Sequence, residues 1–215
     1  MTFLLYFFLG ASLGSFLGLI YDRFPQKSII WPPSHCCNCQ NQLRARDLVP
    51  ILSWCLNKYK CRFCHIPISP FYCLLGTTYG ILFTLCLSFH YLTLIDLAIL
   101  SLSLFLSIYD YYSRSYPLLF WLLAYGVGFL GCGLNLLSVF FLLIGLLAII
   151  KPIKIGSGDF FYLAFLALFY PLSLILWTIQ GASLLGLVYS FWSKQKVLPF
   201  IPFLSAALFI LLLLT

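Results

Sequence analysis

Residues 118–150 read LLFWLLAYGVGFLGCGLNLLSVFFLLIGLLAII, an apolar stretch without a single charged side chain. A helix that crosses the hydrocarbon core of a bilayer needs about 20 mainly apolar residues. We therefore expect this stretch to form two short membrane-embedded helices, at 117–132 and 135–150.

The rest of the chain has the same character, except for one polar segment near the N-terminus. Hydrophobic residues make up 63% of the 215 residues, charged residues only 8%, and the mean hydropathy is +1.05. A soluble domain carries roughly 25% charged residues, so these few charges cannot cover a water-facing surface. The composition predicts an all-α polytopic membrane protein whose partner is the lipid bilayer.

The apolar sequence divides into about eight transmembrane helices, each assigned from the length that a bilayer requires. The predicted domains are a first transmembrane helix at 1–22, a cytosolic Cys-rich domain at 23–70 and a transmembrane core at 71–215. The first run lacks a basic flank and a small-residue cleavage signal, so we expect it to be retained. The predicted spans are 3–22, 71–89, 93–110, 117–132, 135–150, 160–177, 179–193 and 199–214.

The charge pattern predicts the orientation of these spans. The net charge of +7 comes from 12 Lys and Arg against 5 acidic residues, and the basic residues sit in short clusters between apolar runs. Such clusters mark cytosolic loops, so we expect no nucleic-acid partner. With the N-terminus outside, every basic residue falls in 23–70, 111–116, 151–159 or 194–198, all facing the cytosol. The pattern predicts a multi-pass protein of the cell membrane with its Cys-rich domain in the cytosol.

Two Cys-x2-Cys pairs in the polar segment predict a metal site. The four thiols of Cys36, Cys39, Cys61 and Cys64 match the tetrahedral preference of structural Zn²⁺. Four protein ligands leave no open coordination position, so the site is expected to stabilise the fold rather than to hydrolyse a substrate. Free thiols in a cytosolic loop are the alternative interpretation.

Two of the five aspartates lie where apolar runs meet the predicted cytosolic face. Asp110 ends one run, Asp159 opens another, and the spans between them return the chain to the same side. Ionisable residues at membrane depth are costly and usually functional. Two carboxylates at low dielectric do not both ionise easily, so one holds a proton while the other activates water. Gly156 and Gly158 suit a backbone that bends sharply and admits an extended substrate. The alternative for Asp159 is a simple N-cap of the following helix.

The motifs of the chain, in order, include GSFLGLIYDRFP (14–25), the two Cys-x2-Cys pairs, DLVPILSW (47–54), PIS (67–69), Asp110 with Pro117 seven residues later, and GSGD (156–159). Together they resemble the motifs of the type IV prepilin leader peptidases, which are intramembrane aspartic peptidases of the G-x-G-D type. The resemblance implies that Asp110 and Asp159 are the catalytic pair, with Pro117, Gly156 and Gly158 in the supporting loops.

This resemblance implies a membrane-embedded aspartic endopeptidase with residues 71–215 as its peptidase core. It would cleave the leader peptides of prepilins or pseudopilins at the cytosolic membrane face, after a Gly or Ala. Many members also methylate the new N-terminal amine with S-adenosylmethionine. The sequence shows no separate nucleotide-binding motif for that second activity, which rests on the resemblance alone.

The departures from the family pattern concern substrate orientation and methyl transfer. Leu118 and Phe161 stand where the family often has an acidic residue and a lysine. Both aspartates are retained, and the size and pattern are similar to the competence-pseudopilin branch of Gram-positive bacteria. One rival hypothesis is a non-catalytic membrane scaffold or pilus or competence assembly partner whose cytosolic domain is stabilised by zinc. The other is a small transporter that uses the aspartates for proton coupling.

Overall fold

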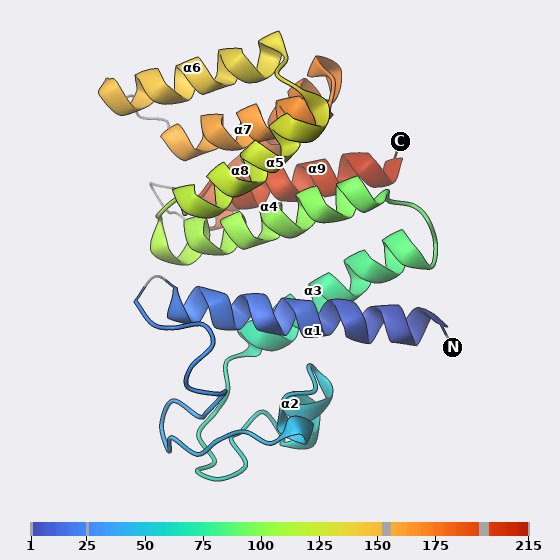
Figure 1. Ribbon diagram of the computed structural model, residues 1–215, viewed down its shortest axis with the longest axis vertical. Coiled ribbons are helices and arrows are strands. Elements are labelled where there is room, and N and C mark those ends of the chain that lie inside the picture. The colour runs from blue at the N-terminus through green and yellow to red at the C-terminus, as the bar shows by residue number, and fades with distance from the viewer. Residues whose placement is uncertain (1, 25, 152–155, 194–197, 215) are drawn as a thin grey trace. The chain divides into compact units, whose positions relative to one another are not determined.

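The computed structural model describes residues 2–24, 26–151, 156–193 and 198–214, and within these ranges it contains helices and no β-strand (Figure 1). This confirms the all-α prediction. The helices are α1 (Thr2–Arg23), a short 3-10 helix η1 (Ala45–Asp47), α2 (Leu52–Leu56), α3 (Pro70–Leu87), α4 (Leu94–Ser113), α5 (Leu118–Cys132), α6 (Leu136–Ile150), α7 (Ser157–Phe169), α8 (Leu172–Ser193) and α9 (Ile201–Leu214).

Four of these helices are long and apolar enough to cross a bilayer, namely α1, α3, α4 and α8. The other apolar helices, α5, α6, α7 and α9, are shorter. The chain is thus a membrane protein, as its composition predicts. The number of crossings stays a prediction, because helices of 13 to 15 residues are shorter than the span of about 20 that a bilayer core requires.

One predicted boundary is wrong. The span lengths predict a break at residue 178, between spans 160–177 and 179–193, but the helix break lies at Tyr170 and Pro171. Tyr170 has φ −119° and ψ 147°, the extended conformation that a following proline favours. Helix α8 therefore begins immediately after Pro171 and continues through residue 178 without interruption.

The chain forms two compact units, residues 1–97 and residues 98–215. In the first unit, α1 and α3 pack against each other through glycines of α1. A Cβ atom on Gly14 would lie 2.9 Å from the carbonyl oxygen of Leu75 and 3.0 Å from the ring of Tyr79. Small residues let two membrane helices approach this closely. Near the C-terminus of α1, the Tyr72 hydroxyl of α3 donates a hydrogen bond of 2.5 Å to the Asp22 carboxylate.

In the second unit, α7 is enclosed by its neighbours. Every residue from Phe161 to Leu168 is buried, and a helix that is apolar on all sides is one that belongs in a core. Side chains of α5 and α6 donate hydrogen bonds to its carbonyl groups. The Trp121 indole N–H donates to Phe161 (2.8 Å), and the Ser138 hydroxyl donates to Ala164 (2.9 Å). These contacts fix the position of α7, at whose N-terminal end Asp159 lies.

The packing of α1 on α3 gives a first prediction. Gly14→Ala places a methyl group against a backbone carbonyl, which cannot move away as a flexible side chain would. We expect a loss of about 1–3 kcal/mol in unfolding free energy, measured as thermal or denaturant unfolding of the purified chain in detergent. Gly126→Ala in α5 is the matched control, because its Cβ meets nothing within 4 Å. Equal stability of the two variants would contradict the proposed packing role.

Candidate active site and metal centre

The four predicted metal ligands come together in the segment that connects α1 to α3. The sulfur atoms of Cys36, Cys39, Cys61 and Cys64 all lie within 4.8 Å of one another, and those of Cys36 and Cys64 are 3.7 Å apart. In a tetrahedron with Zn–S bonds of about 2.3 Å, neighbouring sulfurs are about 3.8 Å apart. The cluster therefore has the size of a tetrahedral metal site, and it could hold a metal ion.

The two Cys-x2-Cys turns have equivalent backbone hydrogen bonds. In the first turn, the Cys36 amide donates to the Asn41 carbonyl (3.1 Å) and the Gln40 amide donates to the Cys36 carbonyl (2.9 Å). The second turn repeats both bonds, from Cys61 to Ile66 (2.8 Å) and from His65 to Cys61 (2.9 Å). The chain thus forms two matching knuckles, each of which presents two thiols to the same point.

Backbone amides around the knuckles favour the thiolate form that a metal requires. The amide of Ile66 lowers the pKa of the Cys64 thiol to about 6, and the amide of Cys39 lowers the pKa of Cys36. The Asn41 amide acts in the same sense on Cys39, but burial and the neighbouring thiols of Cys36 and Cys64 outweigh it and raise the pKa of Cys39 to about 11. Thiols held this close compete for ionisation, and a bound cation would remove that competition.

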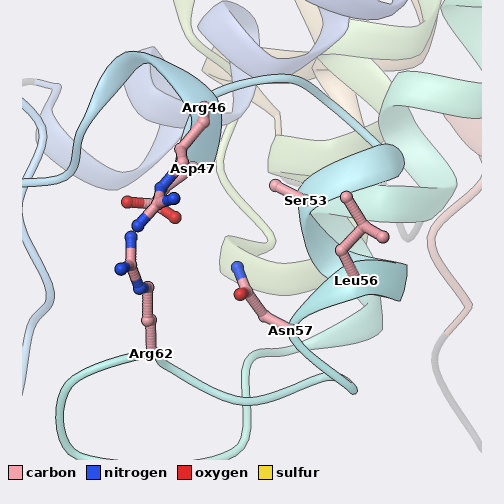
Figure 2. Close-up of a pocket in the computed structure, with 6 residues that line it drawn as sticks. All are labelled: Arg46, Asp47, Ser53, Leu56, Asn57 and Arg62. Carbon is pink, nitrogen blue, oxygen red and sulfur yellow. The ribbon is translucent and has the colours of Figure 1, made fainter.

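A hollow of about 260 Å³ in this domain is lined mainly by polar residues, among them Arg46, Asp47 and Arg62. Figure 2 shows the side chains of Arg46 and Arg62 directed toward Asp47. The Asp47 carboxylate accepts a hydrogen bond from the backbone amide of Arg44 (3.2 Å). Asp47 therefore has a role in the local fold of the Cys-rich domain.

Asp110 lies near the C-terminal end of α4 and is half-buried. Its carboxylate accepts a hydrogen bond of 3.1 Å from the backbone amide of Ile201, the first residue of α9. A carboxylate at this end of α4 opposes the dipole of its own helix. The structure adds the N-terminus of α9, which favours a negative charge at this position. Only tertiary packing brings these two helix ends together, and sequence reasoning missed the contact.

Asp159 occupies the first turn of α7, as its third residue. The N-cap of this helix is Gly156, so the alternative that Asp159 is a simple N-cap is wrong. Gly156 has φ −63°, and neither it nor Gly158 adopts a left-handed conformation. Both glycines therefore have backbone conformations that other residues can also adopt. The Asp159 carboxylate lies 3.4 Å from the position that a Cβ on Gly156 would occupy.

The two aspartates lie in the same unit, close enough to interact electrostatically. The loop between α4 and α5 contributes Tyr116, whose ring packs on Gly158. A Cβ atom on Gly158 would lie 2.8 Å from Cδ2 of Tyr116. The next residue, Pro117, is the N-cap of α5. Gly156 and Gly158 thus lie next to Asp159 at the start of α7, and Tyr116 is an addition that the sequence did not indicate. The supporting role of these glycines and of Pro117 stays a prediction.

The structure thus describes a helical membrane protein with a four-cysteine cluster that could hold a metal ion and with a pair of half-buried aspartates. Residues 8–90 match the family model for the Bacterial Peptidase A24 N-terminal domain. This match covers most of α1, the Cys-rich domain and α3, and it ends before either aspartate of the candidate site.

Curated relatives agree with this match. The chain is 40% identical over 82 residues to a "Prepilin leader peptidase/N-methyltransferase" of Myxococcus xanthus, covering 38% of this chain and 24% of the relative. It is 34% identical over 82 residues to a "Type 4 prepilin-like proteins leader peptide-processing enzyme" of Escherichia coli, covering 29% of this chain and 30% of that protein. A "Prepilin leader peptidase/N-methyltransferase" of Klebsiella pneumoniae is 33% identical over 86 residues, which is 37% of this chain and 38% of the relative.

The resemblance to type IV prepilin leader peptidases is therefore confirmed. The chain spans between about a quarter and two fifths of the length of these relatives. No solved structure matches the chain. The Gram-positive competence branch stays a prediction.

The metal centre gives a second prediction. We expect purified protein to contain about one zinc ion per chain, and Cys39→Ser to lower that content strongly because a ligand is lost. Elemental analysis of the detergent-purified chain measures both. Cys37→Ser is the matched control, since Cys37 lies in the same knuckle but is exposed and outside the cluster. Wild-type protein without bound metal, or equal zinc in both variants, would refute the assignment.

Proposed function

We propose that this chain is a membrane-embedded aspartic endopeptidase that cleaves the leader peptide of type IV prepilins or pseudopilins. The observation that carries the proposal is the pair of half-buried aspartates, Asp110 and Asp159, the only two aspartates in the second unit. They come from the end of α4 and the first turn of α7, and buried apolar residues such as Tyr109 and Phe161 lie beside them in the sequence. The names of the relatives support the substrate class.

In the proposed mechanism, the two carboxylates share one proton because two negative charges at low dielectric repel each other. The N-terminus of α9 favours a negative charge on Asp110, so we assign Asp110 as the base and Asp159 as the acid. Asp110 removes a proton from water, whose oxygen attacks the scissile carbonyl carbon. The proton of Asp159 goes to the carbonyl oxygen. Collapse of the tetrahedral intermediate breaks the C–N bond, and a proton is transferred to the leaving amine.

The proposed topology places this chemistry at the cytosolic face. It combines about eight spans with an external N-terminus, and it is supported by the one-sided distribution of basic residues. Lys154, Lys194 and Lys196 contribute to that distribution and lie outside the described residues. In this arrangement the leader reaches the aspartates from the cytosol, while the hydrophobic helix of the mature protein stays in the bilayer.

Zinc and S-adenosylmethionine are the proposed ligands besides the substrate. The four-thiol cluster would hold zinc as a structural ion that stabilises the Cys-rich domain. Methyl transfer is a second candidate activity, because several of the relatives are named as both leader peptidase and N-methyltransferase. Mass spectrometry of the processed N-terminus, with and without S-adenosylmethionine, tests it directly.

The aspartate pair gives a third prediction. Asp110→Asn and Asp159→Asn should each reduce cleavage by about 10³-fold or more, because removing one member of a catalytic unit disables the whole. The measurement is co-expression with a prepilin or pseudopilin and detection of the processed product by its mobility shift. Asp96→Asn is the matched control: it lies on the same helix as Asp110, where its carboxylate accepts hydrogen bonds from Thr93. Processing that survives both active-site substitutions would favour the scaffold or transporter hypothesis.

A further inference from the structure

The hydroxyl of Tyr116 is a buried polar group of the second unit. Its oxygen is buried and has no hydrogen-bond partner among the residues that the structure describes. Two other tyrosines of this unit show the ordinary situation. The Tyr162 hydroxyl donates to Ser103 (2.7 Å), and the Tyr125 hydroxyl pairs with Ser138 (2.7 Å). Because a buried hydroxyl without a partner is costly, the Tyr116 hydroxyl requires an explanation.

The ring of Tyr116 is held against the first turn of α7, the turn that carries Asp159. It packs on Gly158, where a Cβ atom would come within 2.8 Å of Cδ2 and 3.1 Å of Cγ. Its centroid also lies 6.4 Å from that of Phe161 on α7. The absence of a side chain at Gly158 thus lets an aromatic ring lie against the residue that precedes Asp159.

The Tyr116 hydroxyl is bonded to neither carboxylate, although its ring contacts Gly158, the residue before Asp159. Tyr116 is within electrostatic range of Asp159 and of Asp110, yet its oxygen forms no hydrogen bond to any described residue. A substrate group that accepted a hydrogen bond from this hydroxyl would therefore lie in the same region as the two carboxylates. An unpaired donor beside a carboxylate pair is the arrangement expected for a group that meets the reacting carbonyl.

We propose that the Tyr116 hydroxyl donates a hydrogen bond to the oxygen of the scissile peptide carbonyl, and that Tyr116 is a further catalytic residue. This inference rests on the proposed peptidase function. When water adds to the carbonyl carbon, the electron pair of the C=O bond moves onto oxygen. The Tyr116 O–H stabilises the charge that develops there and keeps its own proton, while the proton exchange is left to Asp110 and Asp159. The bond is strongest in the transition state, so it acts on kcat more than on substrate binding.

The test compares Tyr116→Phe with Tyr125→Phe in the full chain, purified in detergent and assayed with a synthetic prepilin-like peptide. Tyr116→Phe keeps the ring on Gly158 and removes only the hydroxyl, so we expect kcat to fall by about 10²–10³-fold with KM nearly unchanged. A peptide inhibitor with a tetrahedral hydroxyl-bearing carbon in place of the scissile carbonyl should lose affinity, whereas an uncleaved product peptide should not. Tyr125→Phe removes a hydroxyl that is paired with Ser138 and should keep wild-type kcat.

A second variant addresses the position of the ring. Gly158→Ala pushes against the Tyr116 ring, so it should reduce kcat in the wild-type background and have a smaller additional effect in the Tyr116→Phe background. Full additivity of the two substitutions would contradict the proposed coupling of Gly158 to the hydroxyl.

The outcomes separate this inference from the proposed function. If Tyr116→Phe keeps the wild-type kcat while Asp110→Asn and Asp159→Asn abolish cleavage, the proposed role of Tyr116 is wrong and the proposed peptidase function stands. A Tyr116→Phe protein that loses thermal stability and substrate affinity together also overturns it, since that pattern belongs to a packing residue. Cleavage that persists in both aspartate variants, or no cleavage by the wild-type chain, overturns the peptidase function and this inference with it.

Discussion

The enclosure of α7 is the constraint on which the candidate site depends. A helix buried on every side in an apolar environment can carry no unpaired polar group along its length, since each would cost several kcal/mol. Its residues from Phe161 to Leu168 are accordingly buried, and neighbouring helices supply hydrogen-bond donors to its carbonyl groups. The only carboxylate of the helix lies in its first turn, where free backbone amides and the end of the apolar packing make a charge tolerable. The position of Asp159 is thus a consequence of how α7 is packed.

Asp110 also lies at a helix end, but near the C-terminus of its helix rather than the N-terminus. A carboxylate near the C-terminus of α4 is unfavourable when that helix is considered alone. The backbone amide of Ile201 supplies a hydrogen bond, and the N-terminus of α9 supplies a favourable dipole. Two helix termini from distant parts of the sequence thereby hold one carboxylate near another. In the proposed function this would keep a base ionised in apolar surroundings and close to its acid.

The Cys-rich domain obtains its structure from a different source. Most of its residues are exposed or half-exposed, so it has little apolar core of its own. Its order comes from the two matching knuckles and from the close approach of α1 and α3 at its ends. Metal binding would supply the folding free energy that a small core cannot. This is also the part of the chain where the relatives match, which fits a domain whose ligand spacing tolerates little variation.

The sequence by itself determined the membrane class, the helical fold, the four-cysteine cluster and the resemblance to prepilin leader peptidases. Each of these depends on composition or on spacing along the chain, which the sequence states directly. It also indicated Asp110 and Asp159 as the candidate pair, since only five acidic residues were available. The tertiary structure alone decided that the N-terminus of α9 donates a hydrogen bond to Asp110 and that Tyr116 lies on Gly158. Both are contacts between residues far apart in sequence. The helix break at Pro171 is a local feature that the proline itself indicates, but spans assigned from the thickness of the bilayer do not locate it.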